Sequence, residues 1–152
     1  MSEPLRILVA EDDPSDALLL ERAFSRVAVN VPIHFVRDGQ EVVDYLQGVA
    51  PFDNREVYPL PKLLVLDLSM PRPNGFEVLM WLRRNSLSLE GDSHLARRLV
   101  VILTASALAE DINRAYALGA NSYLIKPQDP GGLERIATGL ENYWVKLNTP
   151  PD

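Results

Sequence analysis

Apolar residues along the chain form two patterns, short continuous runs and longer stretches with helical spacing. The runs lie at 5–10, 32–36, 63–66, 99–103 and 122–125, and turn or polar residues follow each of them. Such runs are typical of strands buried on both faces of a parallel sheet. Between them, apolar residues three or four apart predict helices at 14–27, at 40–47, from 75 onward, at 109–118 and at 131–147. Strands and helices are therefore expected to alternate along the chain.

Local signals mark where several helices begin and end. Asp13 is expected to cap the first helix, with Pro14 at its first position, where a missing backbone N–H does no harm. Gly48 and Gly119 are expected at the C-terminal ends of the second and fourth helices. These signals agree with the boundaries that the apolar pattern predicts.

The alternation predicts an α/β fold: a doubly wound, five-stranded parallel sheet with helices on both faces, of the flavodoxin-like type. Crossovers between parallel strands are right-handed, which leaves few topologies. We expect the strand order 2-1-3-4-5. A length of 152 residues suits one domain, so residues 1–152 are expected to form a single domain with a short C-terminal extension.

Composition narrows the possible functions. The apolar fraction of 47% and the charged fraction of 24% are those of an ordinary globular protein. A net charge of −6 argues against nucleic-acid binding, which needs a basic face. The sequence has no cysteine, no signal-peptide features at its N-terminus and no apolar run long enough for a membrane helix. We expect a cytoplasmic protein that binds neither nucleic acid nor membrane.

Acidic, hydroxyl and basic residues follow four of the predicted strands. Glu11 and Asp12 follow the first strand, Asp67 the third, Thr104 the fourth and Lys126 the fifth. Each alone has an ordinary explanation as a helix cap, a strand residue, a solvated lysine or the start of a turn. In the predicted order, however, the carboxyl ends of these strands meet at the edge where open α/β sheets bind ligands. The side chains are therefore expected to form one site.

The three carboxylates of this site require a cation, because like charges raise one another's pKa. Oxygen ligands without His or Cys suit Mg²⁺, which prefers to share its site with phosphate. The lysine can neutralise one phosphoryl oxygen, the threonine can donate to another, and a carboxylate can form an aspartyl phosphate. The predicted chemistry is phosphoryl transfer with Mg²⁺ as cofactor.

Four segments resemble the receiver domain of response regulators in two-component signalling. They are ILVAEDD at 7–13, LLVLDLSMPRPNG at 63–75, VILTAS at 101–106 and ANSYLIKP at 120–127. The order and spacing of these segments match the family over nearly the whole chain. The resemblance implies a switch that a histidine kinase or a phosphotransfer protein phosphorylates, and not an enzyme beyond intrinsic autophosphatase activity.

The resemblance also implies a role for each matching residue. The matches are Asp67 for the phosphoacceptor; Glu11, Asp12, Asp67 and the backbone carbonyl of Ser69 for the metal ligands; Thr104 and Tyr123 for the switch pair; and Lys126 for the phosphate-binding lysine. The bond between Lys126 and Pro127 is expected to be cis, an isomer that is accessible at low cost only before proline.

The chain departs from the family pattern in three places. Glu11 replaces the commoner aspartate, the connection 50–61 is long and contains prolines, and the connection 85–98 is an insertion or a short extra turn. With the C-terminal sequence ENYWVKLNTPPD, these segments are similar to single-domain regulators paired with bacterial phytochrome kinases. The sequence ends soon after the receiver segments, so its output is expected to be made through protein contacts.

Two rival classes fit the sequence less well. A small phosphohydrolase of the haloacid-dehalogenase type would need a second aspartate two residues after its nucleophile, where Ser69 stands. A nucleotide-binding module would need a G-x-x-x-x-G-K-[ST] or a G-x-G-x-x-G loop, and the sequence has neither. His34 and His94 are interpreted as surface or loop residues and not as phosphate donors.

The last predicted helix has more apolar residues than one sheet face can use. The residues expected to pack on the sheet are Leu133, Ile136, Leu140 and Leu147. Tyr143, Trp144 and Val145 are consecutive and cannot all face the sheet as well. One hypothesis is a two-fold homodimer through this helix and the C-terminal extension, with 109–118 and 122–125 contributing. The alternative is a tryptophan that closes the core.

Overall fold

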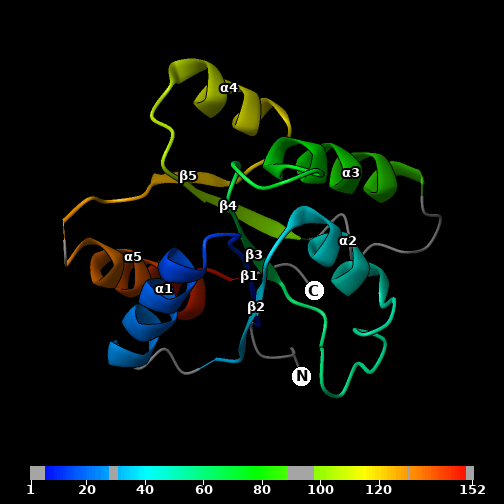
Figure 1. Cartoon of the computed structure of the whole chain (residues 1–152), viewed down its shortest axis with the longest axis horizontal. Coiled ribbons are helices and arrows are strands. Elements are labelled where there is room, and N and C mark those ends of the chain that lie inside the picture. Colours follow the sequence, from blue (N-terminus) through cyan, green and yellow to red (C-terminus); the bar gives the residue numbers. More distant parts are fainter. Residues whose placement is uncertain (1–5, 28–30, 89–97, 130, 150–152) are drawn as a thin grey trace.

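A five-stranded parallel sheet forms the centre of the molecule (Figure 1). The computed structural model describes residues 6–27, 31–88, 98–129 and 131–149. The strands are β1 Ile7–Ala10, β2 Ile33–Val36, β3 Leu63–Leu66, β4 Leu99–Thr104 and β5 Ser122–Ile125, in the order β2-β1-β3-β4-β5. All neighbouring strands are parallel, so the predicted fold class and strand order are confirmed. Leu5, the expected start of the first strand, lies outside the described residues.

Helices cover both faces of the sheet. They are α1 Pro14–Arg26, α2 Gly39–Gln47, α3 Gly75–Ser88, α4 Ala109–Ala117, α5 Gly132–Leu140 and η1 Glu141–Leu147. α1 and α5 lie on one face, and α2, α3 and α4 lie on the other (Figure 1). Ile7 and Val9 of β1 pack toward α1 and α5, whereas Leu8 packs toward α2 and α3. Burial on both faces explains why the apolar run of each strand is continuous.

The helix ends follow the signals in the sequence. The Asp13 side chain caps α1 by accepting hydrogen bonds from Ser15 N at 2.8 Å and Asp16 N at 3.2 Å. Gly48 ends α2 with φ 73°, and Gly119 follows α4 with φ 103°. Both angles lie in the left-handed region, which glycine adopts without a steric penalty. Among the described residues, no helix combines the length and the hydropathy that crossing a membrane requires.

α3 extends to Ser88, six residues beyond Leu82, the last of the apolar residues that predict this helix. The first residues of the connection 85–98 are helical, and Asn85 Nδ2 donates to Trp81 O at 2.8 Å. The final turn of a surface helix can lack a continuous apolar stripe, so an apolar period does not locate its end. Residues 89–97, which hold most of this connection and His94, lie outside the described residues.

The last helix changes its hydrogen bonding where α5 ends. A π-helical segment, η1, continues to Leu147, and Asn148 N donates to Tyr143 O at 2.5 Å. Trp144 and Val145 pack against the core between the sheet and α5, whereas Leu147 is 75% exposed. The prediction that Leu147 packs on the sheet is wrong, because it assumes 3.6 residues per turn throughout, and the π-helical turn is wider.

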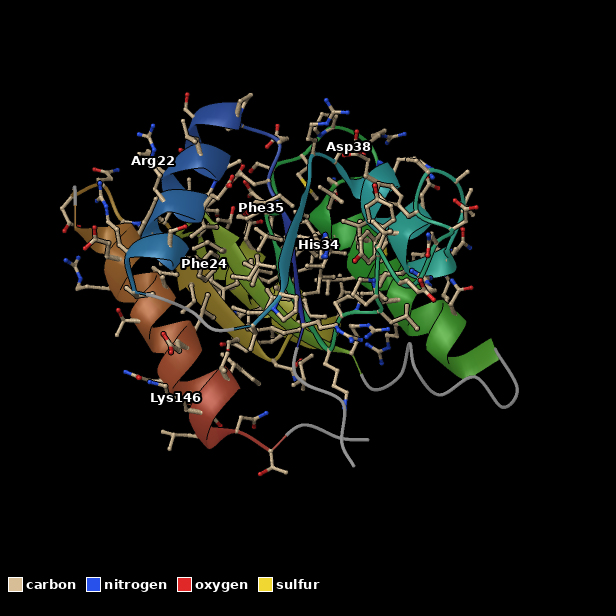
Figure 2. All side chains as sticks on the ribbon, turned by 90° about the horizontal axis from the view of Figure 1, so that it is seen from below. Arg22, Phe24, His34, Phe35, Asp38 and Lys146 are labelled. Atoms are coloured by element: carbon tan, nitrogen blue, oxygen red, sulfur yellow. The ribbon has the colours of Figure 1, made fainter. Side chains whose placement is uncertain are left out.

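The connection 50–61 is attached to the end of α2 by Arg55. The guanidinium of Arg55 donates to Tyr45 O at 2.7 Å and to Tyr58 O at 3.2 Å. The rings of Tyr45 and Tyr58 each lie 6.0 Å from the ring of His34. His34 and Phe35 point to opposite sides of β2 (Figure 2). His34 is therefore a half-buried strand residue and not a loop residue, and burial lowers its pKa.

Candidate functional site

The polar residues that follow the strands meet at the carboxyl edge of the sheet, as the sequence predicts. The last residues of β1 and β3 are register partners, so Glu11 and Asp67, which come next, leave the sheet side by side. Lys126 N donates to Thr104 O at 2.7 Å, which joins the ends of β4 and β5. Glu11, Asp67 and Thr104 are buried, and Asp12 is half-buried.

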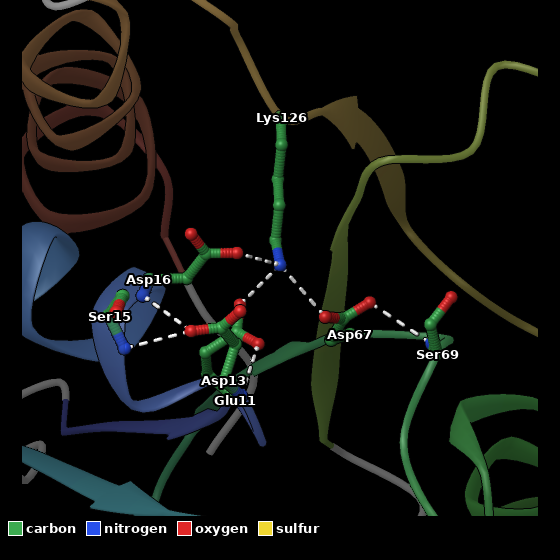
Figure 3. Close-up of polar contacts among 7 residues, drawn as sticks. All are labelled: Glu11, Asp13, Ser15, Asp16, Asp67, Ser69 and Lys126. Carbon is green, nitrogen blue, oxygen red and sulfur yellow. Dashed lines mark hydrogen bonds and ion pairs between the residues drawn. The ribbon is translucent and has the colours of Figure 1, made fainter.

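The ammonium group of Lys126 links these strand ends (Figure 3). Its Nζ lies 2.5 Å from Glu11 Oε1 and 2.9 Å from Asp67 Oδ2. A third carboxylate, Asp16 in the first turn of α1, lies 3.0 Å from the same nitrogen. Burial alone would lower the pKa of Lys126, but its bonds to Glu11, Asp67 and Asp16 outweigh burial and raise it. The lysine is therefore charged in the site.

Asp16 is a site residue that the sequence did not predict. An acidic residue in the first turn of a helix is explained by the helix dipole alone, so nothing singles it out. The available signal is its position: α1 begins directly after the acidic pair, and Asp16 lies within one turn of that start. A first-turn side chain at this point lies at the same edge of the sheet as the strand ends.

The two buried carboxylates differ in their pKa. Burial pushes the pKa of Asp67 upward, but hydrogen bonds from Lys126 Nζ and from Ser69 N at 3.1 Å outweigh burial, so the pKa lies below its ordinary value. Burial raises the pKa of Glu11 to about 7, against the opposing effect of Lys126. Asp67 is therefore ionised at neutral pH, the state in which a carboxylate can act as a nucleophile.

Glu11, Asp12 and Asp67 form a group that fits a hard divalent cation. One carboxylate oxygen from each residue lies within 4.8 Å of the other two. The donors are all oxygens, without His or Cys, which is the ligand set that Mg²⁺ prefers. The amide of Ser69 bonds to Asp67, and the role of its backbone carbonyl as a further ligand stays a prediction.

Thr104 and Tyr123, the predicted switch pair, lie on adjacent strands. Thr104 is fully buried beside Asp67, and its Oγ1 completes no hydrogen bond with the described residues. Burying a hydroxyl without a hydrogen-bond partner costs free energy, so an acceptor that enters the site, such as a phosphoryl oxygen, would gain a favourable bond from Thr104. Tyr123 OH donates to Ser106 O at 2.9 Å, and that bond would break if the ring turned.

The backbone of Gly75 lies very close to the backbone of the loop that follows Asp67. A Cβ at this position would lie 2.5 Å from Asp67 O and 2.6 Å from Leu68 Cα, both of which are backbone atoms. Gly75 N donates to Leu68 O at 3.1 Å. α3 can therefore begin this close to the site only with glycine at its first position.

The predicted cis bond between Lys126 and Pro127 is wrong. The cis bonds of the described residues are Ala50–Pro51 and Arg72–Pro73. A prolyl bond favours the trans isomer by about 0.5–1 kcal/mol, so cis needs surroundings that select it. The Lys126 ammonium reaches its carboxylates with the bond to Pro127 in the trans form.

Sequence comparison establishes the class of protein that this fold and site define. A family model described as the response regulator receiver domain matches residues 7–138. The chain belongs to this family, the receiver domains of two-component signalling.

Individual relatives match almost the whole chain. Response regulator Rcp1 of Synechocystis sp. is 30% identical over 148 residues, which are 97% of this chain and 94% of Rcp1. The probable methanogenesis regulatory protein FilR2 of Methanothrix harundinacea is 35% identical over 149 residues, which are 98% of this chain and 89% of FilR2.

Two solved structures are also similar. The phosphorylated cyanobacterial phytochrome response regulator RcpA has a TM-score of 0.84 at 31% identity, covering 99% of this chain and 100% of RcpA. RPA3017, a response regulator in red light signaling of R. palustris, has a TM-score of 0.85 at 32% identity, covering 97% of this chain and 99% of RPA3017. The predicted resemblance to phytochrome-associated regulators is confirmed.

Proposed function

We propose that this protein is a response regulator that accepts a phosphoryl group on Asp67 from a histidine kinase or a phosphotransfer protein, and that it signals through protein contacts. The observation that carries the proposal is the state of Asp67. Its buried, ionised carboxylate is held by Lys126 Nζ at 2.9 Å and Ser69 N at 3.1 Å, beside two further carboxylates. Family membership supports the same role.

The residues of the site account for each part of the transfer. An oxygen of Asp67 attacks phosphorus, the P–N bond to the donor histidine breaks, and an acyl phosphate forms on Asp67. Lys126 can then donate to one phosphoryl oxygen, and the unpartnered hydroxyl of Thr104 can donate to another. Mg²⁺ bound by the three carboxylates and the backbone carbonyl of Ser69 would neutralise negative charge on the phosphoryl oxygens.

The proposed class is a phosphoacceptor switch in the cytoplasm, with at most intrinsic autophosphatase activity. Its phosphate donor is a sensor histidine kinase or a phosphotransfer protein, and bacteriophytochromes are the first candidates. The similarity to a phytochrome response regulator and to a red-light signalling regulator supports that choice. The proposed downstream partner is a protein, since a net charge of −6 disfavours nucleic acid.

Incubation with Mg²⁺ and acetyl phosphate tests the proposal directly. We expect the intact mass to increase by one phosphoryl group, the modification to be labile to hydroxylamine, and peptide mapping to locate it within 63–75. A chain that gains no phosphate under these conditions, or gains it only on a hydroxyl side chain, would contradict the proposal.

Thr104→Ala is expected to separate phosphorylation from signalling. Without the hydroxyl, Asp67 can still accept phosphate, but the phosphoryl group cannot draw the end of β4 toward it. Amide hydrogen exchange around Tyr123, on the α4–β5 surface, should then change less on phosphorylation than in the wild type. Equal exchange changes in both proteins would count against the coupling of Thr104 and Tyr123.

We further propose a two-fold homodimer through the last helix and the C-terminal extension, with α4 and β5 contributing. Tyr143 is 53% exposed and Leu147 is 75% exposed on η1, and exposed aromatic residues are enriched at interfaces. Leu108 of the loop before α4 and Ile125 of β5 are exposed as well, at 58% and 46%. Trp144 packs partly against the core. The exposed apolar residues of η1 are therefore Tyr143 and Leu147.

Leu147→Glu is expected to weaken this dimer, because it places a charge in the proposed interface. Sedimentation at micromolar concentration, with and without phosphodonor, would show a lighter species than the wild type. Val57→Glu, a change at a site that is 52% exposed on the connection 50–61, serves as the control and should leave the assembly unchanged. A wild type that stays monomeric in both conditions ends the hypothesis.

A further inference from the structure

One ammonium group contacts three carboxylates at the centre of the site. Lys126 Nζ lies within 3.0 Å of Glu11, Asp67 and Asp16, and an ammonium has three N–H donors. Glu11 and Asp67 also belong to the group that fits a divalent cation. Lys126 and a metal ion therefore compete for the same carboxylates.

Asp16 differs from the other two partners of Lys126. It belongs to α1 and not to a strand end, and it is not part of the metal-binding group. Its side chain is 40% exposed, whereas those of Glu11 and Asp67 are 4% and 5% exposed. Asp16 is thus the partner that Lys126 does not share with a metal ion.

The space beside Lys126 and Asp16 is open, so the fold alone does not fix the lysine side chain. A cavity of about 320 Å³ opens beside both residues, and its wall includes Leu20 of α1 and Leu133 of α5. Figure 3 shows Asp16 and Asp67 on opposite sides of the lysine nitrogen. Asp16 can therefore hold the ammonium from the side that faces away from Asp67.

We propose that Asp16 is a positioning residue that keeps Lys126 in place when Mg²⁺ binds, and thereby strengthens Mg²⁺ binding without being a ligand. A bound cation draws on Glu11 and Asp67 and repels the ammonium. Asp16 then becomes the main partner of Lys126, whereas without a cation the lysine contacts all three carboxylates. Loss of Asp16 consequently raises the free energy of the metal-bound state more than that of the metal-free state. The inference rests on the proposed function of the site.

Isothermal titration of the full chain with Mg²⁺ tests this role. Asp16→Asn is expected to weaken binding by roughly three- to tenfold, at the lower end of the couplings found between contacting residues, since Asp16 is partly exposed. Asp12→Ala, which removes a ligand, should lose most of the binding, and Asp16→Glu should restore it toward the wild-type value. Asp13→Asn is the matched control: it removes a carboxylate from the same helix end, but Asp13 bonds to backbone amides and asparagine caps a helix equally well.

A double-mutant cycle separates positioning from simple charge. In a Lys126→Gln background, Asp16→Asn should have little effect on Mg²⁺ affinity, because there is no ammonium left to hold. An equal loss in both backgrounds, or in Asp13→Asn, would mean that any nearby charge acts in this way and would overturn the proposal. Should Lys126→Gln fail to fold, the comparison of Asp16→Asn with Asp13→Asn decides the question.

Two negative results have different meanings. A wild type that binds no Mg²⁺ would refute the metal part of the proposed function and this inference with it. A wild type that binds Mg²⁺, together with an Asp16→Asn variant of equal affinity, would refute the role of Asp16 alone.

Discussion

Asp67→Asn is expected to abolish phosphorylation by acetyl phosphate while the protein stays folded. An amide has neither the charge nor the nucleophilicity of a carboxylate, so the acyl phosphate cannot form. Asparagine has nearly the same shape as aspartate, and its oxygen can still accept the bond from Ser69 N, which measures 3.1 Å in the wild type. Lys126 keeps Glu11 and Asp16 as partners. Intact mass after incubation with Mg²⁺ and acetyl phosphate measures the effect.

The matched control for this substitution is Asp38→Asn. Asp38 caps α2 by accepting a bond from Glu41 N at 2.8 Å, and asparagine can do the same. This variant should gain one phosphoryl group as the wild type does. A hydroxylamine-labile phosphate on another residue of the Asp67→Asn protein would show that Asp67 is not the acceptor.

Lys126→Met is expected to lower the free energy of unfolding by about 3–5 kcal/mol in buffer without Mg²⁺, the range for removing one partner of a buried ion pair. The lysine side chain is 15% exposed and its partners Glu11 and Asp67 are 4% and 5% exposed, so water screens the loss only weakly. Urea unfolding measures the difference. Added Mg²⁺ should recover part of it, since the cation replaces the missing positive charge.

Arg135→Met provides the control for this second prediction. Arg135 Nη2 lies 2.9 Å from Asp129 Oδ2, and the two side chains are 67% and 50% exposed. Exposed pairs of this kind contribute about 0–1 kcal/mol, so the substitution should hardly change the unfolding curve. If Lys126→Met were as stable as Arg135→Met without Mg²⁺, the buried carboxylates would not depend on the lysine.

The sheet and most of the site could be predicted from the sequence because both depend on strand ends. An apolar run that stops at Asp67 or Thr104 marks the carboxyl end of a buried strand, and the strand order then brings those ends together. Asp16 could not be predicted in the same way. Its contact with Lys126 depends on where the first turn of α1 lies relative to β5, which no spacing in the sequence encodes.

The C-terminal helix was harder to predict for a different reason. Its apolar residues fit 3.6 residues per turn as far as Leu140. The apolar residues that follow fit either this spacing or the wider turn that the structure shows. In the wider turn, Trp144 and Val145 pack against the core and Leu147 is exposed. The prediction of a cis bond before Pro127 was wrong. It rested on the family resemblance alone, and no contact that could be predicted from this sequence selects the cis isomer there.

The attachment of the connection 50–61 by Arg55 lies at the end of the sheet opposite the site. The connection enters β3 at its amino end, whereas Asp67 follows the carboxyl end, and the four residues of β3 separate the two by about 13 Å. Arg55 bonds to the backbone carbonyls of Tyr45 and Tyr58, and the rings of these two residues pack against each other, so the connection has its own supports. A substitution in this segment is therefore expected to change the surface at the amino end of the sheet and to leave the geometry around Asp67 as it is.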